Sequence, residues 1–164
     1  MKHIRSFAAI AVVVFGFVLN VEAGQQKEQP KAGPAQSTGT SVEYSSAASS
    51  SSRPLSEFVR VGNVIYLSGK LGTDSTGKLA AGGIAPETKQ TLENIRTVLE
   101  KNGSSMDQVF KCTVMLADMK EWGDMNSVYT TFFKKERMPA RSAFGTSGLA
   151  LNARVEIECI ALMK

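Results

Sequence analysis

Histidine is nearly absent from this chain, and that scarcity excludes several kinds of catalytic site. The 164 residues contain one histidine, His3, in an N-terminal stretch that has the features of a targeting segment. A mature chain without histidine cannot run Ser-His-Asp or Cys-His catalysis, and it lacks the commonest ligand of transition metals. The two cysteines match no metal-binding or redox spacing. We therefore predict no metal site and no cofactor.

The chain also lacks nucleotide-binding motifs and a strong charge of either sign. It contains no Walker loop, GxGxxG pattern, zinc spacing or internal repeat. Its formal net charge is +4, from 19 basic and 15 acidic side chains, which is too weak and dispersed to favour a nucleic-acid partner. The length suits one domain with a hydrophobic core better than two.

The longest hydrophobic run lies at the N-terminus. A basic stretch at residues 1–6 is followed by thirteen apolar or small residues, Phe7 to Leu19, and then by small residues up to Ala23. This run is shorter than the roughly 20 residues that span a bilayer. We therefore predict a signal peptide at residues 1–23 that is cleaved after Ala23, a periplasmic or secreted protein, and no membrane span after cleavage.

The composition changes twice after the predicted signal. Residues 24–53 are rich in serine, glycine, proline and glutamine and show no apolar periodicity. Such a segment buries too little apolar surface to offset its ordering entropy, so we predict a disordered linker there. The folded domain is predicted to occupy residues 54–164.

Hydrophobic periodicity predicts a compact set of strands and helices in that domain. A hairpin with its turn at Gly62-Asn63 is expected first, because a two-residue turn of this type needs positive φ. Further elements follow from period-two and period-3.6 patterns. They are a helix at 86–102, a strand at 109–116, a second helix from the N-cap Asp118 to about Lys135, and a last strand at 154–162.

This order of elements predicts an α+β fold in which a mixed sheet is covered by two helices on one face. The other face would be bare in a single chain, which predicts an oligomer. The aromatic stripe of the second helix is expected to be core or a subunit contact. In the last strand, Val155, Ile157 and Cys159 alternate with Glu156 and Glu158, so one face is apolar and the other carries two carboxylates.

Cys112 and Cys159 both lie in strand-like segments. An exported chain meets an oxidising compartment, so a disulfide is one possibility. Two buried apolar thiols are the other, and we favour them modestly because free cysteine is among the most buried residue types.

Three stretches of the domain, in the same order, resemble a known family. They are Gly62-Asn-Val-Ile-Tyr-Leu-Ser-Gly69, Asn126-Ser-Val-Tyr-Thr-Thr-Phe-Phe133, and Pro139-Ala-Arg141-Ser142 followed by Val155-Glu156-Ile157-Glu158. Together they look like the Rid family, the reactive intermediate deaminases of the YjgF type. The resemblance runs from about Pro54 to Lys164 and so covers the whole predicted domain.

The resemblance implies a chorismate-mutase-like fold assembled as a homotrimer, with ligand sites in clefts between subunits. Members hydrolyse 2-enamines or 2-imines of amino acids to 2-keto acids and ammonia without a cofactor. Carried over by position, Arg141 would bind the substrate carboxylate through its planar fork of donors. Glu156 would hold or activate the attacking water. Ser68, Gly69 and Asn126 would line the pocket, and Ala143 would contribute through its backbone.

The sequence departs from the family pattern at three places in this pocket. Leu55 stands where a tyrosine is usual, Ala143 stands where a cysteine is common, and Lys70-Leu71-Gly72 replaces the usual Gln-Ile-Pro. These changes bear on which substrate is accepted. Two alternatives to a deaminase therefore stay open: a non-catalytic module that binds small carboxylates or proteins, and, with less support, an endoribonuclease.

Each candidate residue also has a purely structural interpretation. Arg141 and Glu156 are both types that are often simply solvated, and Glu156 or Glu158 can pair with a basic residue across an interface. Asn126 can cap or bridge helices, and Ser68-Gly69 can be only the end of a strand.

Overall fold

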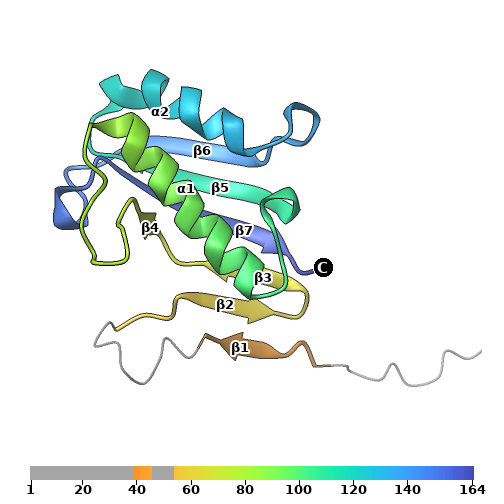
Figure 1. Cartoon of the computed structure of the whole chain (residues 1–164). Coiled ribbons are helices and arrows are strands. Elements are labelled where there is room, and N and C mark those ends of the chain that lie inside the picture. Colours follow the sequence, from red (N-terminus) through yellow and green to blue (C-terminus); the bar gives the residue numbers. More distant parts are fainter. Residues whose placement is uncertain (1–38, 46–53) are drawn as a thin grey trace, which may run out of the picture. The chain divides into compact units, whose positions relative to one another are not determined.

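The computed structural model describes residues 39–45 and 54–164 (Figure 1). The predicted signal peptide and most of the predicted linker lie outside these residues. Within the described ranges, no helix combines the length and the apolar character needed to cross a membrane.

One sheet and two α-helices make up the fold. The strands are β1 (Val42–Tyr44), β2 (Phe58–Val61), β3 (Val64–Leu67), β4 (Lys70–Leu71), β5 (Val109–Leu116), β6 (Ala140–Gly145) and β7 (Val155–Leu162), and the α-helices are α1 (Ile84–Lys101) and α2 (Trp122–Tyr129). Short 3-10 turns occupy Met106–Gln108, Met119–Glu121, Thr130–Phe132, Lys135–Arg137 and Ala150–Asn152. This arrangement confirms the predicted α+β class.

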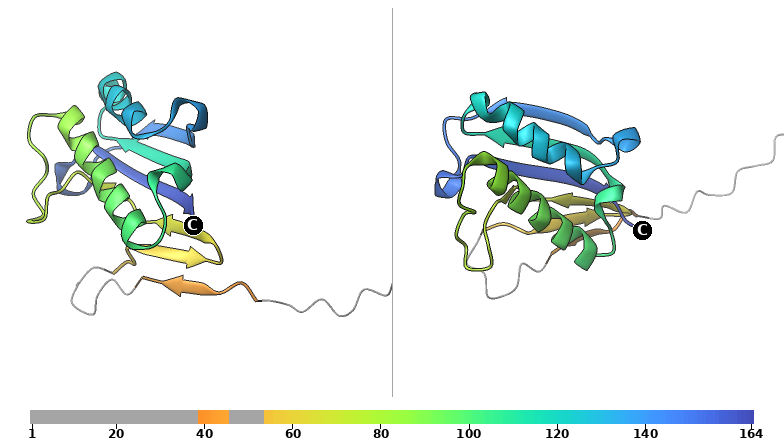
Figure 2. Two further views of the ribbon diagram at one scale, coloured as in Figure 1. Left: turned by 45° about the vertical axis from the view of Figure 1, so that its right-hand side comes forward. Right: turned by 45° about the horizontal axis from the view of Figure 1, so that its top comes forward.

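The sheet is mixed, and both helices lie on one of its faces (Figures 1 and 2). The strand order is β1-β2-β3-β7-β5-β6, with β4 pairing to β7 beyond the end of β3. Strands β5 and β6 run parallel, while the other pairs are antiparallel. The chain between β5 and β6 crosses over through α2, as parallel neighbours require. Strand β6 therefore forms one edge of the sheet and β1 the other.

Alternation along β5 and β7 separates a buried face from an open one. The side chains of Val155, Ile157 and Cys159 are at most 1% exposed and face the helices, as the sequence predicted. The core between sheet and helices is completed chiefly by aliphatic side chains of α1, including Leu92, Ile95 and Leu99. Burial of such side chains stabilises a fold by about 1.5–3 kcal/mol each.

A buried carboxylate fixes the start of β7. Glu87 in the first turn of α1 is only 4% exposed, and its Oε1 accepts hydrogen bonds from the backbone N–H of Arg154 at 2.7 Å and of Val155 at 3.3 Å. A buried charge is tolerated when it is hydrogen-bonded in this way. The bonds hold the residues directly before Glu156 against α1.

Two boundaries differ from the predictions. The second helix ends at Tyr129 rather than near Lys135 and continues as a 3-10 turn. The hydroxyls of Thr130 and Thr131 donate to the carbonyls of Ser127 and Val128, and such local bonds weaken a regular helix. Strand β1 lies inside the range predicted as linker, where it pairs with β2. Three residues are too few to reveal a strand by periodicity.

The modest preference for free thiols is wrong, because Cys112 and Cys159 form a disulfide. The two residues are direct partners in the antiparallel register of β5 and β7, with their Cα atoms 4.2 Å apart. Facing positions of this type bring side chains together. The sequence alone does not give the register, so it could not decide between the two alternatives.

We expect removal of this disulfide to lower stability markedly. The bond closes a loop with a sequence separation of 47 residues, which the chain-entropy model values at about 4 kcal/mol. The double substitution Cys112→Ala with Cys159→Ala should therefore lower the free energy of unfolding by about that amount in urea titrations at one fixed protein concentration. Reductant should destabilise the wild-type protein and leave the double variant unchanged. Equal stability of the wild-type protein with and without reductant would contradict this role.

Candidate active site

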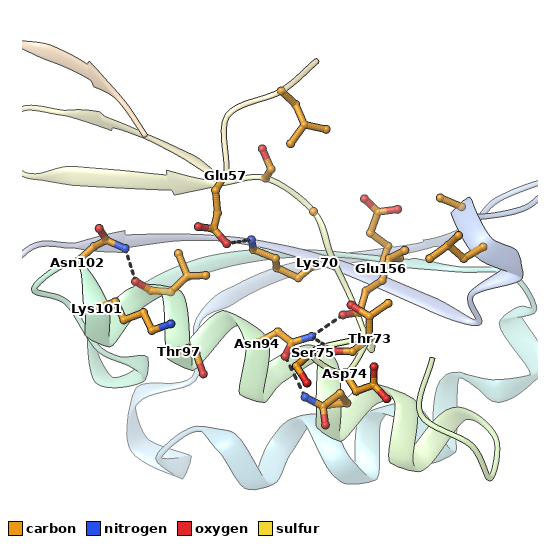
Figure 3. Close-up of a pocket in the computed structure, with 18 residues that line it drawn as sticks. Glu57, Lys70, Thr73, Asp74, Ser75, Asn94, Thr97, Lys101, Asn102 and Glu156 are labelled. Atoms are coloured by element: carbon orange, nitrogen blue, oxygen red, sulfur yellow. Dashed lines mark hydrogen bonds and ion pairs between the residues drawn. The ribbon is translucent and has the colours of Figure 1, made fainter. Parts of the chain in front are cut away.

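A cleft of the domain lies beside the break between β3 and β4. It has a volume of about 1000 Å³ and is lined by residues from the β3–β4 connection, α1, β7 and the turn before β7. Figure 3 shows Glu156 projecting from β7 away from α1, on which Asn94 and Thr97 lie. Three of the predicted site residues, Ser68, Gly69 and Glu156, line this cleft together.

Gly69 is needed where it stands because the Glu156 side chain packs against its backbone. A Cβ at position 69 would lie 2.8 Å from Cδ of Glu156, which is too close for any larger residue without movement of the carboxylate. Ser68 is held in place as well, since its Oγ donates to the carbonyl of Ser56 at 2.6 Å. The Glu156 carboxylate therefore lies against the backbone of the β3–β4 connection.

Polar side chains hold this connection against α1. The amide of Asn94 donates to the carbonyls of Leu71 and Thr73, both at 2.9 Å. Lys70 Nζ lies 2.8 Å from Glu57 Oε1, so the cation that replaces the family's usual glutamine is paired within the cleft. Hydrogen bonds and an ion pair therefore hold this wall of the cleft in place.

Arg141 lies on the opposite face of the sheet from Glu156. In the register of β5 and β6, Arg141 pairs with the buried Cys112, whereas Glu156 pairs with Met115 on the open face. Paired residues of neighbouring strands project to the same face, and successive residues alternate. One chain therefore cannot place both side chains on the same small ligand.

Aromatic rings of α2 surround the Arg141 guanidinium. Its Cζ lies 4.5 Å from the ring centre of Tyr129 and 5.6 Å from that of Trp122, within the range of cation–π contact. Among the described residues, no carboxylate lies within ion-pairing distance of Arg141 and no acceptor takes a hydrogen bond from it. The rings of α2 thus contact the guanidinium, but no described carboxylate neutralises its charge. A cation in this state is suited to bind an anionic ligand.

Tyr129 stays uncharged beside this cation. Its side chain is 1% exposed, and burial raises the pKa of its hydroxyl to about 12, although the Arg141 charge lowers it in part. A phenolate would compete with a ligand carboxylate for the guanidinium. The phenol is therefore neutral throughout the physiological pH range, as an ordinary tyrosine also is.

The other two predicted site residues belong with Arg141. Ala143 follows it by two positions on β6 and so shares its face, where Ala143 packs at the edge of the core. Asn126 is four residues after Trp122 and three before Tyr129, so it shares their face of α2. The predicted residues therefore form two groups, one around Glu156 in the cleft and one around Arg141 beside α2.

Some residues of both groups were missed at the level of the sequence. The sequence predicts Trp122 and Tyr129 to be core or subunit contact, and Tyr129 does lie in the core. Their contact with Arg141 has no sequence signal beyond the spacing that puts both rings and Asn126 on one helix face. Leu151 lines the cleft with φ of 60° and is 64% exposed. No sequence signal marks that position, because left-handed backbone is uncommon for leucine.

Charged side chains are not gathered for metal binding in the part of the chain described here. Residues 39–45 and 54–164 contain no group of three or more His, Cys, Asp or Glu side chains placed to hold a metal ion. The chemistry that the two groups offer is that of one carboxylate and one guanidinium.

The sequence and the structure of the chain are similar to those of known proteins. The family model described as Endoribonuclease L-PSP matches residues 45–163. A mouse protein named 2-iminobutanoate/2-iminopropanoate deaminase is 43% identical over 110 residues, which are 66% of this chain and 81% of that protein. Its human counterpart is 40% identical over 110 residues, 66% of this chain and 80% of that protein. The crystal structure of the Rid family protein YyfA of Yersinia pestis has a TM-score of 0.68 at 31% identity, covering 75% of this chain and all of that one.

Proposed function

The chain belongs to the Endoribonuclease L-PSP family, also known as the Rid or YjgF family, and from this we propose that it hydrolyses 2-enamines and 2-imines of amino acids to 2-keto acids and ammonia. The observation that carries the proposal is the presence of an unneutralised arginine and of a carboxylate in a cleft, in a chain about 40% identical to proteins named as such deaminases.

The reaction needs only these two side chains and water. Arg141 binds the carboxylate of the imino acid with two N–H donors and so orients the C=N bond. Glu156 accepts a proton from a water molecule as the water oxygen bonds to the imine carbon and the C=N π electrons move to nitrogen. Because the imine nitrogen is protonated at the start, the tetrahedral adduct carries a neutral amino group, and Glu156 returns its proton to that group. Ammonia then leaves as the C=O bond forms, and the hydroxyl proton of the adduct passes to the Glu156 carboxylate. One imine and one water thus give one keto acid and one ammonia, without a cofactor.

We further propose that each site forms between two copies of the chain in a homotrimer. The opposite faces of Arg141 and Glu156 support this, because a second copy can supply the residue that the first cannot. The open face supports it too, since large apolar side chains such as Tyr66, Phe144 and Leu162 are exposed on it. Burial of such a patch drives association of subunits.

The direct test is keto-acid release from 2-aminoacrylate generated in situ. The protein should accelerate formation of pyruvate and ammonia above the spontaneous rate, measured in parallel without protein. A wild-type rate equal to the spontaneous one would favour the alternative, a non-catalytic module that binds small carboxylates. One observation speaks for that alternative: Leu55 lines the cleft at the place where the family resemblance implies a tyrosine hydroxyl.

We also propose that the protein works outside the cytoplasm, as a periplasmic or secreted enzyme. The disulfide between Cys112 and Cys159 supports this, since such bonds persist in oxidising compartments. The N-terminal composition described above points the same way. The small net charge leaves ribonuclease activity, the remaining alternative, without support from electrostatics.

A further inference from the structure

Two arginines of the domain, Arg141 and Arg96, lie over aromatic rings. They differ in whether the guanidinium also has an acidic partner. Arg96 lies over Phe132 at 4.9 Å, but its guanidinium also pairs with Glu93 at 2.9 Å. Arg141 contacts two rings and, among the described residues, has no acidic partner. The rings of α2 are therefore the only described groups that hold the Arg141 guanidinium in place.

The two rings differ in how firmly they are fixed. Tyr129 is fully buried and packs against Phe133 with ring centres 4.8 Å apart, so it forms a rigid base under the guanidinium. Trp122 is 39% exposed and lies at the first turn of α2. A flat guanidinium that stacks on rings keeps its in-plane N–H donors free for a carboxylate.

The hydroxyl of Tyr129 takes no part in this arrangement. It is buried and has no hydrogen-bond partner among the described residues. The contribution of Tyr129 therefore comes from its ring, and that of Trp122 likewise from its indole face.

We propose that Trp122 and Tyr129 are positioning residues that hold the Arg141 guanidinium flat against α2, with its donors directed to the carboxylate of the substrate. This inference rests on the proposed function, because it assigns to both rings a part in binding the imino acid. It also predicts that an imine without a neighbouring carboxylate gains nothing from the rings.

The experiment uses the partly exposed ring, because its replacement leaves the core intact. Trp122→Leu should raise KM for the imino acid by about 2- to 30-fold, the range expected for loss of one cation–π contact, with kcat within about twofold of wild type. Trp122→Phe keeps a ring and should raise KM less than Trp122→Leu. Phe132→Leu, which removes the equivalent contact of Arg96, is the matched control and should leave KM unchanged.

The dissociation constant of 2-oxobutanoate, measured calorimetrically on the same variants, separates this inference from the proposed function. If the wild-type protein binds 2-oxobutanoate but does not accelerate hydrolysis, the deaminase proposal alone is refuted. The role of the two rings is then tested by comparing the dissociation constants of the variants with that of the wild-type protein. An unchanged KM and an unchanged dissociation constant in Trp122→Leu would overturn the inference alone. A wild-type protein that binds no 2-oxo acid would overturn both.

Discussion

Replacing Glu156 by glutamine is expected to lower kcat for keto-acid release by about 100- to 10,000-fold, the usual contribution of a positioned general base. Glutamine has nearly the same shape, so its packing against Gly69 and the walls of the cleft should persist. It cannot, however, accept a proton from water. KM should change little, because the carboxylate of the substrate is bound elsewhere. Steady-state kinetics with 2-aminoacrylate generated in situ measure both constants.

The control for this variant lies on the same strand. Glu158 follows Glu156 by two positions, projects to the same open face and is exposed. Glu158→Gln makes the same chemical change without touching the cleft, so its kcat should match that of the wild-type protein. Equal losses in the two variants would mean that charge on this face, rather than a base at position 156, matters for the reaction.

The second large effect is expected at Arg141. Arg141→Ala should lower kcat/KM by at least about 30-fold, the lower end of what removal of one partner of a hydrogen-bonded charge pair costs. Most of the loss should be in KM, since the guanidinium binds the ground state as well as the transition state. Arg141→Lys keeps the charge but loses the planar fork, so it should fall between the wild-type protein and Arg141→Ala.

Arg96→Ala provides the comparison for Arg141→Ala. It too removes an arginine that stacks on a ring at the helix face, but one that is already paired with Glu93. Its kcat/KM should stay near the wild-type value. If Arg141→Ala and Arg96→Ala were equally active, Arg141 would have no role in substrate binding.

The local structure of the domain could largely be predicted from the sequence. Periodicity identified the β2–β3 hairpin, helix α1 and strands β5 and β7, because each has one buried face and so repeats apolar residues at a fixed interval. It misjudged α2, where threonine hydroxyls end the helix at a point that the aromatic stripe does not mark. It missed β1, whose three residues owe their structure to pairing with β2.

Periodicity does not show which residues of neighbouring strands face one another. The disulfide depends on Cys112 facing Cys159 across two strands, and nothing local to either cysteine shows that pairing. The same holds for Arg141. The family resemblance implied a site role for Arg141, but its face of the sheet follows only from its pairing with Cys112.

The candidate site was therefore predicted as a set of residues, whereas its geometry was not. Ser68, Gly69 and Glu156 do meet in one cleft. Arg141, Asn126 and Ala143 lie on the other face of the sheet, together with the rings of Trp122 and Tyr129. A contact of this kind between β6 and α2 depends on packing between elements, which a single sequence does not display.

The most direct test of a site shared between subunits is to mix two inactive variants. Arg141→Ala and Glu156→Gln are each purified, combined in equal amounts, and unfolded and refolded together, with native mass spectrometry to confirm mixed oligomers. In a symmetric ring, about a quarter of the interfaces would then pair an intact Arg141 with an intact Glu156. We predict that the mixture regains up to about a quarter of the wild-type activity. Mixed oligomers that regain none would contradict the shared site.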